Sequence, residues 1–170
     1  NLQAQQVRGL VLDVRDNAGG DTGSCTECLD QLLPEGVLGY TRTGSSQRQI
    51  LATSDDSEID LPMAVLVNEN TSSMAELFAV AIRDYDKGDL VGTTTYGKGV
   101  LQTLYPLDDG SAVRITTAYF DPPASENFDG VGLTPDYEVS LGRDQLATMG
   151  SMDGDDQLEK AVSVLRSSWL

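Results

Sequence analysis

PMAVLVNENTSSMAELFAVAIRDY, residues 62–85, is the stretch that decides the fold class of this chain. It opens with Met63–Val67, an uninterrupted apolar run, as expected of a strand that is buried on both faces. Ser73–Tyr85 then places Leu77, Val80 and Ala81 on one side of a helix. A buried strand followed at once by a helix is the repeating unit of an α/β fold with a parallel sheet.

The same patterns extend the prediction over the rest of the chain. The further predicted elements are strands over Gly9–Val14 and Asp89–Gly92, a hairpin of Val37–Thr43 with Gln47–Thr53 around Gly44–Ser46, a hairpin of Val100–Pro106 with Ser111–Ala118 around Asp109-Gly110, and helices over Cys25–Leu33 and Asp155–Leu165. Residues 1–6 resemble the end of a helix. We therefore expect an α/β domain with a parallel core and an antiparallel edge.

The composition limits what the chain can do. It has 170 residues and a mass of 18.2 kDa, which favours one domain. Lys and Arg number 11 against 27 Asp and Glu, and the resulting charge of -16 disfavours nucleic acid and anionic membrane surfaces as partners. No apolar run approaches the roughly 20 residues of a membrane helix. The chain contains no histidine, which excludes Ser-His-Asp catalysis and His-ligated zinc.

Cys25 and Cys28 form a single Cys-x-x-Cys motif. Two reduced thiols on a helix are the simplest interpretation, and a redox pair or a disulfide are the alternatives. Zinc would need two further Cys or His ligands, and the chain has none to offer. We therefore predict no metal site, and one pair of cysteines does not fix the compartment.

Three loops are expected to meet at one edge of the parallel sheet. Right-handed crossovers bring the carboxyl ends of parallel strands together, and ligands bind at that edge. The loops are Arg15–Gly20, Asn68–Ser73 and Thr93–Gly99. They carry a Gly-Gly turn, a run of hydroxyls at a helix start and a lysine between two glycines. This combination offers a backbone donor loop, a nucleophile and a base.

Ser73 has two interpretations. With Glu76 it forms S-x-x-E, a capping box, so its hydroxyl is expected to cap the helix. Alternatively, the hydroxyl is a nucleophile, because the amide groups and the positive dipole end of the helix start would stabilise an oxyanion beside it. Thr71 and Ser72 compete for this role, and the local pattern does not separate them from Ser73.

Lys98 is either an exposed surface lysine or a general base. Its flanking glycines let the backbone approach neighbouring elements, and only a neutral amine accepts the hydroxyl proton. If residues 98–102 are extended, Gln102 lies on the same face as Lys98, and its amide would orient the Lys98 amine. The alternative is that Gln102 is a polar strand residue that faces water. The Gly19-Gly20 turn is either a tight strand-to-helix turn or an oxyanion donor. Asp84, near the helix end, is more typical of a solvated or helix-terminal carboxylate.

Several separated motifs together resemble the carboxyl-terminal processing peptidases, also called tail-specific proteases, which use a Ser/Lys pair. The motifs are GLVLDVRDNAGG from Gly9, VLVNENTSSMAELFAVAIRDY from Val65, VGTTTYGKGVLQT from Val91, DGSAVRITTAYF from Asp109 and GVGLTPDYEV from Gly130. They agree in order with the family over about residues 7–140. The family's common SASASE and NPGG are here TSSMAE and NAGG.

Carried over position by position, the resemblance implies that Ser73 is the nucleophile, Lys98 the general base and Gln102 the residue that orients the lysine. The family's gap of 25 residues from serine to lysine is reproduced, which selects Ser73 over its hydroxyl neighbours. The implied fold is a crotonase-like, Clp-protease-like α/β core with parallel central strands, β-hairpins and flanking helices.

The resemblance also implies an oxyanion hole, formed by the N–H of Met74 and by the Gly19-Gly20 turn, in which Gly19 is the favoured donor and Gly20 the alternative. Asp84 matches an acidic family position with a supporting role. Residues 1–170 are expected to be a single peptidase core domain, truncated at its N-terminus and without the PDZ-type domain of the family. On its own, this piece is expected to be weak or inert.

The function that follows from the resemblance is a serine endopeptidase that cleaves proteins near their C-termini, with no metal or organic cofactor. Its partners would be protein or peptide substrates bound through their C-terminal segments, and self-association is left open. The family mostly works in the periplasm, cell envelope or plastid lumen, which implies an extracytoplasmic location. The alternative is a non-catalytic ligand- or peptide-binding module on the same scaffold, against which the intact Ser73, Lys98 and Gln102 argue.

Overall fold

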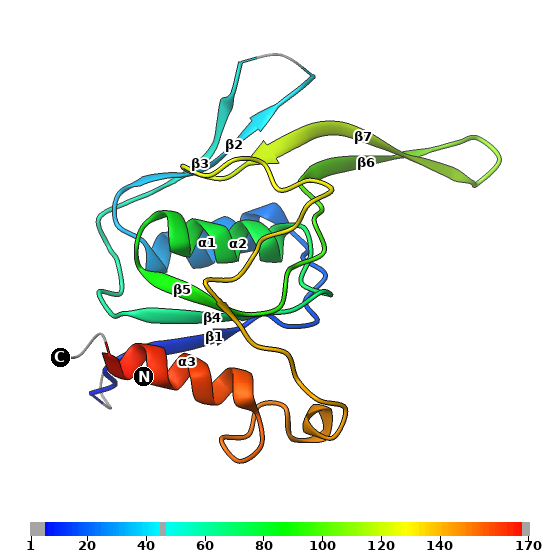
Figure 1. The fold of residues 1–170 in the computed structure, drawn as a ribbon. Helices are drawn as coiled ribbons and strands as arrows, with labels where there is room; N and C mark the ends of the chain where they lie inside the picture. The colour runs from blue at the N-terminus through cyan, green and yellow to red at the C-terminus, as the bar shows by residue number, and fades with distance from the viewer. Residues whose placement is uncertain (1–5, 45–46, 168–170) are drawn as a thin grey trace.

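The computed structural model describes residues 6–44 and 47–167 of the chain (Figure 1). Its elements in chain order are β1 Leu10–Asp13, α1 Thr22–Leu32, β2 Gly36–Arg42, β3 Gln49–Ser54, β4 Met63–Val67, α2 Met74–Asp84, β5 Gly88–Gly92, β6 Val100–Pro106, β7 Ala112–Asp121, β8 Tyr137–Glu138, the 3₁₀ helix η2 Gln145–Thr148 and α3 Asp156–Ser167. The strands form a parallel sheet, β1-β4-β5-β8, and an antiparallel sheet, β3-β2-β7-β6. The predicted α/β class, with parallel central strands, hairpins and flanking helices, is confirmed.

Strand β4 is apolar throughout because it is covered on both faces. Met63, Val65 and Val67 belong to the larger hydrophobic cluster, which also contains the core residues of α2. Ala64 and Leu66 point the other way and pack in a second cluster with residues of α3. The strand also pairs in parallel with β1 on one side and β5 on the other. Successive side chains of a strand point to opposite faces, and both faces of β4 are covered. Every position of β4 is therefore apolar.

Helices α1 and α2 lie between the two sheets, and α3 covers the opposite face of the parallel sheet (Figure 1). The expected antiparallel edge is wrong: the two hairpins do not extend the parallel sheet but join through β2 and β7 into a sheet of their own. The physical reason is the apolar surface of α2, whose residues are buried around most of the helix. One sheet covers only one side of such a helix, and the second sheet covers the other.

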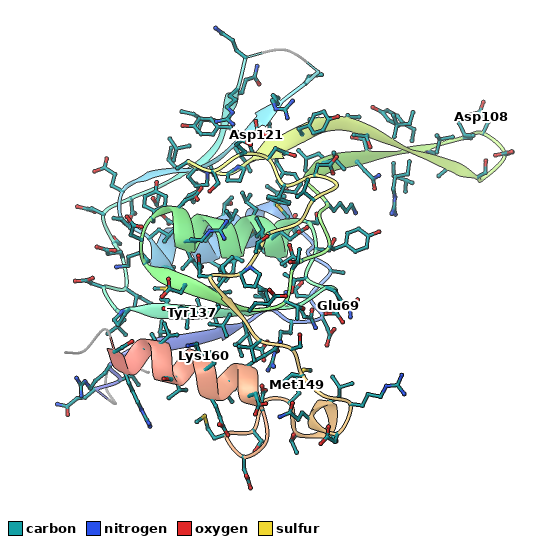
Figure 2. The ribbon with its side chains drawn as sticks, viewed as in Figure 1. Glu69, Asp108, Asp121, Tyr137, Met149 and Lys160 are labelled. Carbon is teal, nitrogen blue, oxygen red and sulfur yellow. The ribbon has the colours of Figure 1, made fainter. Side chains whose placement is uncertain are left out.

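Ion pairs with at least one buried partner link segments that are distant in the sequence. Arg15, which follows β1, donates to Asp155 before α3 at 2.9 Å and to Asp13 at 2.7 Å. At the antiparallel sheet, the buried Asp121 accepts from Arg42 at 2.9 Å and Arg48 at 3.0 Å (Figure 2 labels Asp121). Each buried charged group in these pairs is therefore compensated by a group of opposite charge.

Some boundaries differ from the prediction. Helix α1 begins at Thr22 rather than Cys25 because the side chain of Asp21 accepts from the Ser24 N–H at 2.8 Å and caps it. The prediction missed β8 and η2, each only a few residues long. The helix end expected over residues 1–6 and the tip of the first hairpin fall largely outside the described residues. Within the described ranges, no helix is long and apolar enough to cross a membrane.

Candidate active site

The three predicted loops do meet, because β1, β4 and β5 are parallel neighbours. Backbone hydrogen bonds join the loops directly. The Ser72 N–H donates to the Asn17 carbonyl at 2.9 Å, and the Tyr96 N–H donates to the Thr71 carbonyl at 3.0 Å. The loop after β4 is therefore held on both sides by the loops after β1 and β5.

The backbone at Ser73 is strained. Ser73 is the N-cap of α2 with φ 59° and ψ -123°, in a region that a residue with a side chain rarely adopts. Such a conformation costs about 1–3 kcal/mol and concentrates at functional sites. The neighbouring hydroxyls are less available, since Thr71 is fully buried with its Oγ1 donating to the Val14 carbonyl at 2.8 Å, and Ser72 is only 8% exposed. Ser73, which is half-buried, is the accessible hydroxyl of the three.

A single buried carboxylate connects the Ser73 loop to the Lys98 loop. Oε2 of Glu76 accepts the Ser73 N–H at 2.9 Å and the Lys98 N–H at 2.8 Å. Oε1 accepts the Gly97 N–H at 2.7 Å and the Thr95 hydroxyl at 2.5 Å. Glu76 has no exposed surface. The sequence identified it as the acidic partner of a capping box, but the bonds to the Lys98 loop were missed.

Lys98 is half-buried between two glycines that pack against the segment after β7. A Cβ on Gly97, which has φ 85°, would lie 2.7 Å from the Gly132 nitrogen, and one on Gly99 would lie 2.7 Å from Asn127 Oδ1. The expectation that these glycines permit close backbone approach is confirmed. No hydrogen bond or ion pair engages the Lys98 amine within the described part of the chain, and none joins it to the Ser73 hydroxyl. The fold thus fixes the two backbones through Glu76, while the Lys98 amine has no partner among the described residues.

Gln102 is exposed on β6. Lys98 lies just before β6, which begins at Val100. The pairing of β6 with β7 is irregular between Leu101 and Gln102, where one residue of β7, Thr117, has no partner. The orienting role of Gln102 stays a prediction.

The glycine turn lies directly against the start of α2. A Cβ on Gly19, which has φ 83°, would lie 2.7 Å from the Ser72 carbonyl and 2.8 Å from the Met74 nitrogen. The Gly19 N–H is already used, since it donates to Asn17 Oδ1 at 2.9 Å. The N–H groups of Gly20 and Met74, by contrast, have no acceptor among residues 6–44 and 47–167. Gly20 and Met74 are therefore candidate oxyanion donors, whereas the N–H of Gly19, the favoured glycine, is already bonded.

Asp84 lies at the other end of α2, about 16 Å along the helix axis from Ser73 at 1.5 Å per residue. Its carboxylate accepts the N–H groups of Ala124 and Ser125, each at 2.8 Å, and the Ser125 hydroxyl. Asp84 thus anchors the segment that follows β7, and its contacts lie away from the three loops.

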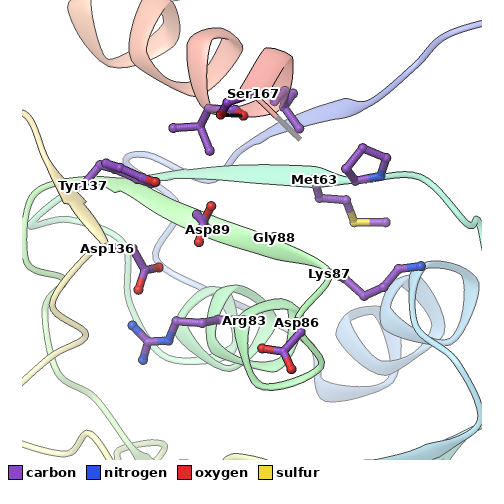
Figure 3. Close-up of a pocket in the computed structure, with 12 residues that line it drawn as sticks. Met63, Arg83, Asp86, Lys87, Gly88, Asp89, Asp136, Tyr137 and Ser167 are labelled. Carbon is purple, nitrogen blue, oxygen red and sulfur yellow. Dashed lines mark hydrogen bonds between the residues drawn. The ribbon is translucent and has the colours of Figure 1, made fainter. Parts of the chain in front are cut away.

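Two pockets lie at opposite ends of the parallel sheet. One of about 300 Å³ borders the candidate oxyanion donors and is lined by Gly20, Met74 and residues of α1. The other, of about 460 Å³, lies at the amino ends of β4 and β5 and contains Asp89 and Asp136 (Figure 3). Burial and the charge of Asp136 raise the pKa of Asp89 there. In the part that the structure describes, no cluster of His, Cys, Asp or Glu could hold a metal ion.

This fold and this arrangement of loops belong to a known class of hydrolases. The model of the family described as "Peptidase family S41" matches residues 1–139, and the chain belongs to this family.

Among its relatives, carboxyl-terminal-processing peptidase 2 of Arabidopsis thaliana is 36% identical over 155 residues, which are 89% of this chain and 30% of that protein. The carboxyl-terminal-processing protease of Synechocystis is 31% identical over 164 residues, covering 96% of this chain and 38% of that protein. The solved structure of the photosystem II D1 C-terminal processing protease superposes with a TM-score of 0.75 at 35% identity, covering 82% of this chain and 36% of that one. The chain thus spans only about a third of the length of these three proteins, from 30% to 38%.

Proposed function

We propose that the protein containing this chain is a serine endopeptidase in which Ser73 is the nucleophile and Lys98 the general base. Neutral Lys98 takes the proton of the Ser73 hydroxyl while Oγ attacks the scissile carbonyl. The N–H groups of Gly20 and Met74 donate to the oxyanion that forms. Lys98 then returns the proton to the leaving amine, and water hydrolyses the acyl ester.

The observation that supports this proposal most is the link through Glu76. One carboxylate oxygen accepts the backbone N–H of both Ser73 and Lys98, so two residues far apart in sequence are held at a fixed backbone separation. The strained conformation of Ser73 is a second support, because an unfavourable conformation persists only where the surrounding structure enforces it. A scaffold for ligand binding alone would need neither feature.

The names of the relatives suggest the substrates. Both curated relatives are named for processing at a carboxyl terminus, and we extend that substrate class to this protein: polypeptides cleaved near their C-termini. We also propose an extracytoplasmic site of action. Gln102 is proposed to orient the Lys98 amine once substrate is bound, since catalytic hydrogen bonds often tighten only in the complex.

The test compares three variants of the protein at its natural full length. Ser73→Ala and Lys98→Ala should each lower the cleavage rate of a fluorogenic peptide by about 10³-fold or more, because each removes one half of a cooperating pair. Ser72→Ala is the matched control, since it deletes the adjacent buried hydroxyl and should keep the rate within a few fold. If Ser73→Ala cleaves as fast as the unmodified protein, the assignment of the nucleophile is wrong. Peptide binding without cleavage by the unmodified protein would favour a binding module.

A further inference from the structure

Helix α1 places both cysteines on the wall of the pocket that borders the candidate oxyanion donors. Cys25 and Cys28 line this pocket of about 300 Å³ together with Gly20, Met74 and Phe78. Neither cysteine takes part in a disulfide. A group attached to either sulfur would therefore occupy the space in front of the first residue of α2.

The two thiols have different surroundings. The Cys25 thiol is half-buried and donates to the Met74 carbonyl at 3.4 Å. Burial, with a smaller contribution from Cys28, raises the pKa of Cys25 to about 12, so this sulfur stays protonated and is a poor nucleophile. Cys28 is exposed and has no hydrogen-bond partner among the residues that the structure describes. Cys28 is the sulfur that a reagent from solution can reach.

We propose that Cys28 is a reversible modification site for small disulfides without negative charge, and that the adduct blocks the pocket beside Ser73. The blocking role rests on the proposed peptidase function, whereas the modification does not. In the reaction, the Cys28 thiolate attacks one sulfur of the disulfide R–S–S–R. The S–S bond of the reagent breaks, a Cys28–S–S–R bond forms, and R–S⁻ leaves and takes a proton from water. Cys28 is oxidised and one half of the reagent is reduced, and a thiol reverses the exchange.

The charge around Cys28 selects the reagent. Asp21 lines the same pocket. An adjoining pocket of about 680 Å³ shares Cys28 and Phe78 and adds Glu27 and Asp30. None of the described residues that line the two pockets is a lysine or an arginine. Coulomb repulsion within a Debye length therefore slows the approach of an anionic disulfide, and a cationic one is attracted.

The mixed disulfide is expected to persist rather than convert to a Cys25–Cys28 bridge. Conversion needs Cys25 to attack the Cys28 sulfur as a thiolate. Cys25 is instead held as a thiol by its burial and by its bond to Met74, on the side of α1 that faces α2. The Cys-x-x-Cys motif therefore behaves as one reactive and one structural thiol.

The experiment treats the full-length protein and its Cys28→Ser variant with cystamine, 2-hydroxyethyl disulfide and glutathione disulfide. These carry positive, no and net negative charge. Peptide mapping by mass spectrometry locates the adduct, and peptidase rates are measured before and after treatment with dithiothreitol. We expect one adduct, on Cys28, forming at least tenfold faster with cystamine than with glutathione disulfide at low salt. Cleavage should fall at least tenfold and recover with dithiothreitol, and Cys28→Ser should show no loss on treatment.

The outcomes separate the two proposals. An adduct on Cys25, a Cys25–Cys28 bridge as the main product, or equal rates for all three reagents would overturn the modification site. Full labelling of Cys28 with unchanged cleavage would overturn the blocking role. If the untreated protein cleaves no peptide, the peptidase function fails and the blocking role fails with it, while the location and charge preference of the adduct still decide the modification site.

Discussion

Replacing Glu76 by glutamine tests whether one carboxylate positions both halves of the candidate site. Glutamine keeps the shape of the side chain but offers one carbonyl oxygen and one NH₂ group in place of two acceptors. The Oε2 position faces the N–H groups of Ser73 and Lys98, and the Oε1 position faces the Gly97 N–H and the Thr95 hydroxyl. The hydroxyl can reverse and accept from NH₂, whereas an N–H cannot. The amide oxygen is therefore expected to take the Oε2 position.

The size of the effect follows from this orientation. The Gly97 N–H loses its acceptor, which costs about 1–3 kcal/mol for a buried group. The remaining bonds lose the charge on their acceptor, and charge-assisted bonds are roughly twice as strong as neutral ones. We expect Glu76→Gln to lower the free energy of unfolding by about 2–4 kcal/mol while the Ser73–Lys98 link survives. Its kcat should fall less than about tenfold, whereas Glu76→Ala, which severs the link, should lose about 100-fold or more.

Urea unfolding and steady-state kinetics on the same preparations separate positioning from stability. Thr95→Val is the matched control. It removes the hydroxyl that donates to Glu76 Oε1 and accepts from the Leu133 N–H, and it leaves the bonds of Glu76 to Ser73 and Lys98 in place. It should lose stability comparable to Glu76→Gln but keep kcat within a few fold of the parent. A folded Glu76→Ala variant that retains full kcat would show that this carboxylate does not position Ser73 and Lys98. If Glu76→Ala does not fold, a Glu76→Gln variant that loses as much kcat as Lys98→Ala refutes the expected orientation of the amide.

Three further substitutions test other parts of the structure. Gly19→Ala should lower the free energy of unfolding in denaturant by at least about 2 kcal/mol, because the new Cβ would lie 2.7 Å from backbone at a residue with φ 83°. Gly20→Ala is the control, since its Cβ would meet nothing within 4 Å, and it should change that free energy by no more than about 0.5 kcal/mol. Equal losses for the two variants would contradict this packing. Burial alone would raise the pKa of Asp155, but hydrogen bonds from Arg15 and from backbone N–H groups outweigh it and lower the pKa. Because the folded-state pKa is depressed, the stabilisation is complete above the unfolded value near 4 and is lost as the pH falls through the folded value. Asp155→Asn should thus cost about 3–5 kcal/mol at pH 7 and flatten the acid limb of stability, and an unchanged acid limb in urea titrations would argue against it. Asp84→Ala should lower the melting temperature while the folded protein keeps its KM; a changed KM at full folding would place Asp84 in substrate binding instead.

The parts of the fold that sequence predicted are those in which neighbouring residues carry the information. Met63–Val67 is apolar at every position because both faces are covered, and its limits were predicted to the residue. The glycines around Lys98 indicated a close backbone approach, which the packing on Gly132 confirms. The second sheet was not predictable in this way, because the pairing of β2 with β7 joins residues about eighty positions apart and leaves no local pattern.

The candidate site shows the same division. Ser73 and Lys98 were predicted from motifs. Glu76, which bonds to both of their backbones, was predicted to bond only to Ser73. The local bond of Glu76, to Ser73, spans three residues and belongs to a recognisable capping box. Its other bonds reach the segment that begins at Thr95, and only the parallel pairing of β4 with β5 brings that segment near.

A site organised through backbone bonds has a mechanical consequence. The Ser73 and Lys98 backbones are fixed by a carboxylate with no exposed surface, and the turn at Gly19 packs against the same helix start. In the proposed mechanism, the Ser73 hydroxyl and the Lys98 amine can therefore adjust as a substrate carbonyl arrives without disturbing the core. The surrounding packing holds Ser73 in its strained conformation, and the fully buried Glu76 and Thr71 are part of that packing. Loosening that packing should relax Ser73 toward an ordinary helix cap before it unfolds the domain, which would abolish cleavage ahead of any loss of secondary structure.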